Sequence, residues 1–599
     1  MSARAPFRRA AVRCWKPFRR LLGAPLALLV GVAVAAGPAL APPADAASRP
    51  PVRGTMGAVS TDEAQATEVG LEILRRGGNA VDAAVATALA LAVVQPEAGN
   101  LGGGGFAVLK MRTRVAFIDF RETAPAGATR DMYLDESGEP DPQKSWAGPL
   151  ASGVPGSPEG LFQLHYRYGR LALKDVAEPA RRLATDGFVV SSRLQAALEE
   201  EKELLSRFPE TAEVWLPKGE PLRAGSKMRL PELGATIAAY AEKGPKAVTT
   251  GPVAEAVERA VARHGGVLTA ADMAAYQPEW REPVRFEAFG WKFISANLPS
   301  SGGIILGQAL TMLEKLDVAA TERGGAERAH LLSEVLRRTF ADRFLLGDPD
   351  TTAATAAQLL KPAHLAARAA TFDPAKATDS NDVAPKEVGV EIKESADTTH
   401  LSVVDASGNL VALTFTINGL FGCGLYVPEA GFFLNNEMDD FAAAPGKANF
   451  YGLVQGEANA IAPGKRMLSS MSPTIAWRDV DGLMVEGVAL GGRGGSRIPT
   501  STLQVLVNLI VDGDDIQSAL DRPRIHHQWR PDQISYESDA LAPETRAALE
   551  AKGHVLMPLD SVGQVQAVRF EWSPGAMWLE AAAEPRGGGG TPGVARRLP

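Results

Sequence analysis

The sequence predicts an α+β fold, because it combines long helical stretches with a strand-rich part. Residues 411–417 place large apolar side chains at every second position, which is typical of a strand. The Thr- and Val-rich segment 399–404 precedes it, and the turn-forming residues 405–409 lie between the two. Residues 153–372 have a mostly helical pattern. With 599 residues, of which 45% are hydrophobic, the chain can form a substantial core in one to three domains.

The two strands predict a hairpin whose register can be counted. If residues 405–409 form the loop, Val404 lies opposite Leu410, and counting back along both strands places Thr398 opposite Thr416. Directly opposed residues have Cβ atoms about 5 Å apart, so the two hydroxyl groups can touch. A register shifted by one residue would put them on opposite faces.

The predicted pairing of Thr398 with Thr416 across the hairpin suggests nucleophilic chemistry. A threonine hydroxyl needs a neighbouring base, and a chain that cuts itself just before the threonine supplies its own α-amine. An α-amine has a pKa of about 7.7–8.0, which suits a general base. The alternative is that Thr398 begins an ordinary strand, since β-branched residues are common there.

The pattern T-T-H-x-S, followed by G-N-x-V-A-x-T-x-T-x-N-x-x-F-G, resembles the signature of the γ-glutamyltranspeptidases, which are N-terminal-nucleophile hydrolases. The resemblance covers residues 55–580 and implies a four-layer αββα sandwich. It also implies self-cleavage between Asp397 and Thr398, with a large subunit (47–397) and a small subunit (398–599) remaining together as a heterodimer. Thr398 would then be nucleophile and base, and Thr416 would hydrogen-bond its hydroxyl.

The N-terminus resembles a secretory signal peptide. Six basic residues between positions 8 and 20 precede an apolar run, 21–36, and small residues with prolines follow. We therefore expect residues 1–46 to be removed and the protein to be periplasmic or secreted. The alternative is an uncleaved membrane anchor, although the run is short for a span. No later segment is apolar enough for a stable membrane span.

Composition and cysteine content narrow the function classes. A net charge of −8 without a long basic run argues against nucleic-acid binding. Cys14 lies in the signal segment, so Cys423 would be alone in the mature chain, and we interpret it as a packing residue. The eight histidines show no metal-ligand spacing, and the family's chemistry needs no cofactor.

The N-terminal part predicts two helices followed by two strands. Residues 60–63 have the pattern of a capping box for a helix that ends at residues 77–78, and Asn79 caps an alanine-rich helix through residue 94. Strands are expected at 106–110 and 114–120. The glycines at 102–105 lack the lysine of a phosphate-binding loop, so we expect close backbone packing there.

Several residues resemble the family's substrate-binding groups. The DFRE-x-AP context of Arg121 implies that it pairs with the substrate α-carboxylate, since a guanidinium grips a carboxylate through two hydrogen bonds. The alternative is a surface ion pair with Glu122 or Asp119. The resemblance implies that three further residues hold the substrate α-ammonium: Asn418, Glu437 and Asp440. A calcium site is the other interpretation of this acidic stretch, but the spacing of a calcium loop is absent.

The last predicted site residues lie in glycine- and serine-rich loops. The loop 445–456 resembles a lid with Tyr451 at its tip, and Ser469 and Ser470 match a pair that binds the substrate carboxylate; their alternative is a role in a turn or helix cap. Gly494 and Gly495 would donate backbone N–H groups to the oxyanion. The usual Ser-Pro before that pair is replaced by Gly492-Arg493, so Arg493 enters the pocket or ties the loop down.

Taken together, the resemblance predicts γ-glutamyl transfer and hydrolysis, with glutathione as donor and amino acids or peptides as acceptors. The main alternative is a related acylase that acts on dicarboxylyl amides or poly-γ-glutamate. A secreted binding protein on an inactive scaffold is the second alternative. The glycine- and arginine-rich tail, 587–599, is expected to be disordered.

Overall fold

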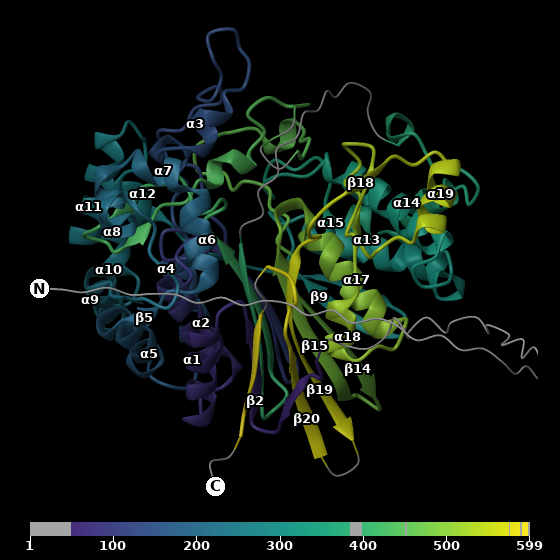
Figure 1. The fold of residues 1–599 in the computed structure, drawn as a ribbon, viewed down its shortest axis with the longest axis horizontal. Coiled ribbons are helices and arrows are strands. Elements are labelled where there is room, and N and C mark those ends of the chain that lie inside the picture. Colours follow the sequence, from purple (N-terminus) through teal and green to yellow (C-terminus); the bar gives the residue numbers. More distant parts are fainter. Residues whose placement is uncertain are drawn as a thin grey trace, which may run out of the picture. The chain divides into compact units, whose positions relative to one another are not determined.

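We describe the fold from a computed structural model, in which residues 49–383, 398–447, 449, 452–573, 576–587 and 590–596 are described. Two seven-stranded sheets form its centre (Figure 1). The first has, in spatial order, β21 (Thr591–Ala595), β2 (Gly57–Thr61), β10 (Thr399–Asp405), β11 (Leu410–Thr416), β3 (Gly104–Met111), β4 (Arg114–Phe120) and β7 (Glu279–Arg281). The second has β1 (Val52–Gly54), β20 (Ala576–Ala582), β19 (Gln564–Ser573), β15 (Leu483–Arg493), β14 (Thr474–Val480), β9 (Trp291–Ser295) and β8 (Val284–Ala288).

The two sheets face each other through an apolar layer. Phe106 and Ala412 of the first sheet and Ile475 and Phe570 of the second belong to one buried cluster. Strand β10 packs against both β15 and β19. The central hairpin is therefore buried on both faces, and every residue of β10 and β11 is buried.

Helices cover the outer face of each sheet (Figure 1). The first sheet packs against α1 (Ala64–Arg75), α2 (Ala80–Val94) and α4 (Ser157–Tyr168), and α5 (Leu173–Asp186) packs on α2. The second sheet packs against α13 (Gly302–Lys315), α17 (Ile498–Ile510) and α18 (Ile516–Asp521), while α14 (Ala326–Arg343) packs on α13 and α19 (Pro543–Ala551) on α14. None of the helices in the described ranges combines the length and the hydropathy that a membrane span requires.

The remaining helices and three small sheets complete the fold. The helices are α3 (Pro142–Trp146), α6 (Ser192–Glu200), α7 (Lys202–Ser206), α8 (Pro209–Trp215), α9 (Pro231–Lys243), α10 (Lys246–Thr249), α11 (Gly251–Arg263), α12 (Ala270–Ala275), α15 (Ala356–Leu359) and α16 (Pro362–Ala370). The small sheets pair β5 (Phe188–Val189) with β6 (Lys227–Met228), β12 (Tyr426–Val427) with β13 (Phe432–Phe433), and β16 (Ile525–His526) with β17 (Ile534–Tyr536) and β18 (Leu556–Pro558).

The structure confirms most of the local predictions. Val404 pairs with Leu410, as counted from the turn. Asn79 caps α2 in a reciprocal capping box with Asp82, and all fifteen residues of α2 are buried. A Cβ atom at Gly103 would lie 1.9 Å from the Thr416 carbonyl oxygen, so the glycine run permits the close packing expected of it.

Two local predictions were wrong. Ser60 does not cap a helix: it lies within strand β2, and its hydroxyl is within hydrogen-bonding distance of two acceptors in the second sheet, Gln566 Oε1 at 2.9 Å and the Ala582 carbonyl oxygen at 2.8 Å. The N-cap of α1 is Glu63, without a side-chain cap. Part of the tail expected to be disordered forms β21, which pairs with the edge of β2 and covers it. In both cases a partner distant in sequence overrides the local signal.

Candidate active site

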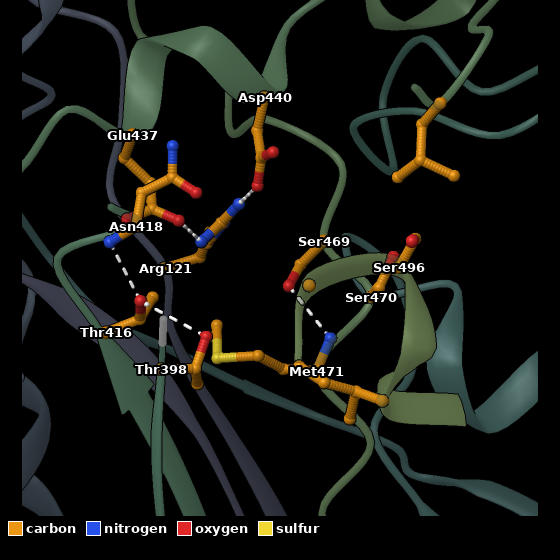
Figure 2. Close-up of a pocket in the computed structure, with 13 residues that line it drawn as sticks. Arg121, Thr398, Thr416, Asn418, Glu437, Asp440, Ser469, Ser470, Met471 and Ser496 are labelled. Carbon is orange, nitrogen blue, oxygen red and sulfur yellow. Dashed lines mark hydrogen bonds and ion pairs between the residues drawn. The ribbon is translucent and has the colours of Figure 1, made fainter. Parts of the chain in front are cut away.

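One pocket lies where β10 begins and β11 ends, and it brings together most of the predicted site residues (Figure 2). The predicted residues that line it are Arg121, Thr398, Thr416, Asn418, Glu437, Asp440, Ser469, Ser470 and Gly495. These come from strand ends and loops separated by up to several hundred positions, so the pocket exists only in the folded chain.

The two threonines meet as the hairpin register predicts. Thr398 Oγ1 lies 3.4 Å from Thr416 Oγ1, and both residues are buried. The Thr416 hydroxyl also accepts a hydrogen bond of 2.8 Å from the backbone N–H of Asn418, which orients it (Figure 2). The Thr398 hydroxyl therefore faces the pocket with a neighbour that can hold its position.

Arg121 lies at the end of the pocket among carboxylates. It is fully buried and forms ion pairs with Glu437 and Asp440, both in the 3₁₀ turn Glu437–Asp440 (Figure 2). Its Nη1 is also 3.7 Å from Glu122 Oε2. Arg121 thus does approach Glu122, as the alternative interpretation expected, but the pair is buried and does not lie at the surface.

This cluster holds more acid than base. Burial raises the pKa of Glu437, although Arg121 opposes the shift, and burial together with the neighbouring Glu437 raises the pKa of Glu122 well above its ordinary value. Burial also raises the pKa of Asp440. Among the described residues, neither oxygen of Glu122 nor Oε2 of Glu437 has a hydrogen-bond partner. The cluster thus has unfilled capacity for a cationic group.

Asn418 adds a neutral acceptor next to the acids. Its backbone is left-handed, with a φ of 74°, a conformation that asparagine tolerates better than most residues. Its side-chain Nδ2 donates to the Asn436 carbonyl at 3.0 Å, which fixes the amide beside the acidic turn.

Ser469 and Ser470 are held on the far side of the pocket. The Ser469 carbonyl accepts hydrogen bonds from both the backbone and the hydroxyl of Ser301, and the Ser469 hydroxyl accepts the N–H of Met471 at 3.1 Å. Ser469 therefore does stabilise a turn, while it also lines the pocket. The buried Ser470 hydroxyl has no hydrogen-bond partner in the described part of the chain.

Gly494 and Gly495 form a tight turn between β15 and α17. Their φ angles are 135° and 55°, so both lie in the region that favours glycine. Gly495 lines the pocket, and Gly494 precedes it against the backbone of Gly563, where a Cβ atom would lie 2.8 Å from the Gly563 Cα. Arg493 is not among the residues that line this pocket.

Sequence reasoning missed four residues that line the pocket: Leu453, Met471, Ser496 and Ile498. Ser496 and Met471 adjoin predicted residues, so adjacency alone was an available signal; the positions of Leu453 and Ile498 depend on how the loops fold. Tyr451 and Asp397 lie outside the described residues.

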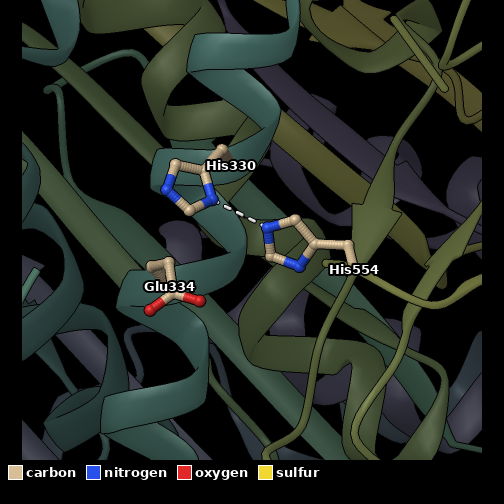
Figure 3. A group of neighbouring side chains, drawn as sticks. All are labelled: His330, Glu334 and His554. Atoms are coloured by element: carbon tan, nitrogen blue, oxygen red, sulfur yellow. Dashed lines mark hydrogen bonds between the residues drawn. The ribbon is translucent and has the colours of Figure 1, made fainter. Parts of the chain in front are cut away.

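A group of potential metal ligands, His330, Glu334 and His554, does come together despite the absence of ligand spacing in the sequence (Figure 3). His330 Nδ1 lies 2.7 Å from His554 Nε2, so the two rings hydrogen-bond each other. Glu334 already forms ion pairs with Arg337 and Arg338. The donor atoms are engaged, which argues for a structural role. Cys423 is buried and burial raises its pKa to about 12, as suits a packing residue.

Comparisons with known proteins place the chain among its relatives. The family model for γ-glutamyltranspeptidase matches residues 66–594. The chain is 42% identical over 521 residues to a glutathione hydrolase proenzyme of Escherichia coli K12, covering 86% of this chain and 89% of that protein. It is 35% identical over 529 residues to an acylase ACY 1 proenzyme of a Pseudomonas species (strain V22), covering 87% and 91%.

A solved structure extends the likeness to the fold. The crystal structure of a cephalosporin acylase from Bacillus halodurans superposes with a TM-score of 0.77 at 24% identity, covering 92% of this chain and 98% of that one. The match of the family model over most of the chain, with relatives well above 30% identity along nearly their full length, shows that this chain belongs to the γ-glutamyltranspeptidase family.

Proposed function

We propose that this protein hydrolyses glutathione and other γ-glutamyl compounds, and transfers the γ-glutamyl group to amino acids or peptides, through an ester on Thr398. One observation carries the proposal. The Thr398 hydroxyl lies 3.4 Å from that of Thr416, in the same pocket as Arg121 and its acidic partners Glu437 and Asp440. A nucleophile thus shares one pocket with groups of both charges, as a zwitterionic substrate requires.

Thr398 becomes active by self-cleavage of the bond between Asp397 and Thr398. The freed α-amine takes the hydroxyl proton, and its ordinary pKa of about 7.7–8.0 suits that role. The E. coli relative is named a proenzyme. Cleavage would leave a large subunit, 47–397, and a small subunit, 398–599.

Strand pairing supports a heterodimer that stays together. The small-subunit strands β10 and β11 lie between β2 and β3 of the large subunit, and β9 of the large subunit pairs with β14 of the small one. We infer that the two chains share one four-layer αββα sandwich, in which neither sheet is complete without both subunits.

The reaction then follows from the groups in the pocket. The Thr398 oxygen attacks the γ-carbonyl carbon as its proton passes to the α-amine. The oxyanion of the tetrahedral intermediate accepts hydrogen bonds from the backbone N–H groups of Gly494 and Gly495. When the intermediate collapses, the amine of the substrate leaves and takes the proton from the Thr398 α-amine. Water or an acceptor amine attacks the resulting ester in the same way and releases Thr398.

The charged cluster would recognise the amino acid head group. The substrate α-carboxylate pairs with Arg121 in place of the protein carboxylates and also hydrogen-bonds Ser469 and Ser470. The substrate α-ammonium binds the groups that are released, Glu437 and Asp440, together with Asn418. The substrate carboxylate therefore displaces the acids from Arg121, and the substrate ammonium pairs with those acids. No buried charge is left unpaired, which would be strongly unfavourable. Tyr451 would close the pocket as a lid; Leu453, which follows it, lines the pocket.

The leader, 1–46, would direct the protein out of the cytoplasm, to the periplasm or the medium. Its basic residues followed by an apolar run and small residues carry this part of the proposal.

The intact mass of the purified protein tests the nucleophile. We expect two chains, the smaller beginning at Thr398, and hydrolysis of a chromogenic γ-glutamyl anilide. Thr398→Ala should remain uncut and inactive. Thr399→Ala is the matched control, because the Thr399 hydroxyl donates to Gln95 instead of facing Thr416, so that variant should still be cut. An uncut wild type, or a cut Thr398→Ala, would disprove the proposal.

The acylase alternative rests on the likeness to the Pseudomonas acylase. A glutaryl anilide keeps the carboxylate of the γ-glutamyl group but lacks its ammonium. We expect the wild type to prefer the γ-glutamyl anilide and Asp440→Asn to lose that preference. A wild type that prefers the glutaryl anilide would support the acylase instead.

A further inference from the structure

Arg493 is the last residue of β15 and lies directly before the turn of Gly494 and Gly495. Glycine is the least restricted residue, so a turn of two glycines needs a constraint from outside the turn to remain in one conformation.

The direction of the Arg493 side chain follows from the strand. A Cβ atom at Gly491 would lie 2.5 Å from His400 Cε1, so that position faces β10 in the opposite sheet. Side chains alternate along a strand, so Arg493 points to the same inter-sheet side, yet it does not line the substrate pocket. It therefore reaches into the space between the two sheets beside the pocket.

Acidic residues surround it there. Arg493 Nε lies 3.9 Å from Asp62 Oδ2, and their side chains are 11% and 2% exposed. Arg193 of α6 approaches the same carboxylate at 3.7 Å. Two further buried acids belong to this group, which we call the Asp62 cluster: Glu63 and Glu97.

The Asp62 cluster places buried carboxyl groups close to the Arg493 guanidinium. Burial raises the pKa of Glu63 to about 6 and that of Glu97 to about 8, while Arg193 and Arg493 lower both. Arg493 Nε and Nη1 are buried without a hydrogen-bond partner among the described residues, and so are both Glu97 oxygens. The ion pair with Asp62 therefore helps to hold this guanidinium, and attraction between charges is strong where the dielectric is low.

We propose that Arg493 is a positioning residue, which anchors the Gly494–Gly495 turn to the Asp62 cluster. The anchor joins the end of β15 in the second sheet to the end of β2 in the first, next to the predicted oxyanion donors. This inference rests on the proposed function of that turn. A loosened turn would weaken stabilisation of the tetrahedral intermediate without changing how the head group binds.

Kinetics of four variants test the anchor, with a γ-glutamyl anilide as substrate and rates expressed per cleaved chain. Removal of one oxyanion donor lowers kcat about 100- to 1000-fold, so for Arg493→Met, which only loosens the turn, we expect about a 10-fold lower kcat with KM changed by less than about 2-fold. Arg493→Lys keeps the charge and should recover most of the rate. Arg493→Pro should recover it as well, because the proline ring supplies a backbone constraint in place of the anchor.

Arg193→Met is the matched control, since it removes the same charge from the same acids but lies on α6, outside the strand that leads into the turn. We expect its kcat to stay near the wild-type value. Three results would overturn the anchor: unchanged kcat in Arg493→Met, an equal loss in Arg193→Met, or an Arg493→Met defect that neither lysine nor proline relieves. Maturation rates measured by intact mass should follow the same order.

Different results would disprove the proposed function and the proposed role of Arg493. A wild type that is uncut, or that does not hydrolyse the anilide, disproves the function itself. A cut and active wild type whose Arg493 variants all match it disproves the anchor alone.

Discussion

Two buried arginine–carboxylate clusters in this protein differ in one respect. On α14, Glu334 receives hydrogen bonds on both oxygens, from Arg337 and the Thr378 N–H on one and from Arg338 and the Thr378 hydroxyl on the other. In the pocket, Arg121 faces Glu437, Asp440 and Glu122, and oxygens of Glu122 and Glu437 have no hydrogen-bond partner among the described residues. The carboxylate oxygens of the Glu334 cluster all have hydrogen-bond partners, whereas, within the described part of the chain, some of those in the Arg121 cluster do not.

The pKa shifts follow the same division. Burial alone would raise the pKa of Glu334, but Arg337, Thr378 and Arg338 lower it to about 2. In the pocket burial dominates, and the pKa values of Glu437 and Asp440 are raised. A saturated cluster stabilises the fold, whereas an unsaturated one stores binding capacity at the expense of stability. We infer that the Arg121 cluster is built for a ligand and the Glu334 cluster for folding.

Asp440→Asn should give the largest effect. If the substrate ammonium depends on this carboxylate, kcat/KM for a γ-glutamyl anilide should fall about 1000-fold, or about 4 kcal/mol, as for loss of one partner of a buried charge pair. The melting temperature should change little, because two carboxylates still face Arg121. An Asp440→Asn protein that keeps its activity but melts at as low a temperature as a Glu334 variant would contradict the distinction between the two clusters.

Glu334→Gln should have the opposite profile. It leaves Arg337 and Arg338 without their shared anion, so we expect about 3 kcal/mol lower unfolding free energy, measured by urea denaturation. The kcat/KM of the folded variant should stay within about 3-fold of the wild type, because Glu334 does not line the pocket. A pronounced loss of activity in the folded variant would assign this cluster to the site.

The free energy of unfolding should depend on pH in opposite ways for the Glu334 cluster and the Arg121 cluster. The folded pKa of Glu334 is lowered, so its contribution is full above its ordinary pKa of 4.5 and is lost as the pH falls toward about 2. That contribution is at most about 3 kcal/mol, at 1.36 kcal/mol per pKa unit. The folded pKa of Glu437 is raised to about 8, so burial of this group carries no charge penalty below pH 4.5, and stability is lost as the pH rises from 4.5 toward 8.

Glu334→Gln should therefore flatten the acidic limb of a stability curve, and Glu437→Gln the limb above pH 4.5. Thermal melts from pH 2 to pH 8 measure both. An acidic limb that survives in Glu334→Gln would mean that other carboxylates control acid unfolding.

The smallest effect is expected inside the pocket, from Thr416→Val. The hydrogen bond between the two threonine hydroxyls is long, at 3.4 Å, so its loss should lower kcat about 5-fold, or about 1 kcal/mol. KM should stay constant, because Thr416 does not belong to the charged cluster. Single-turnover kinetics of the cleaved enzyme would measure this, and a loss above about 100-fold would mean that Thr416 itself takes part in proton transfer.

The sequence by itself determined the features that depend on near neighbours. The turn at 405–409 and the alternation of β11 set the pairing of Val404 with Leu410, and hence the meeting of Thr398 and Thr416. The cap at Asn79 and the strand at Arg114–Phe120 were predictable for the same reason. Local sterics and side-chain periodicity act within a few residues, so a short window contains all the information they need.

The tertiary structure alone decided which distant groups meet. Arg121 pairs with acids more than 300 positions away, Arg493 with Asp62, and His330 with His554, none of which has a local signature. Ser60 and β21 show the same rule, since partners on another strand override capping and composition. Buried charges and hydroxyl groups must find partners wherever the packed chain supplies them, and only the complete fold determines those positions.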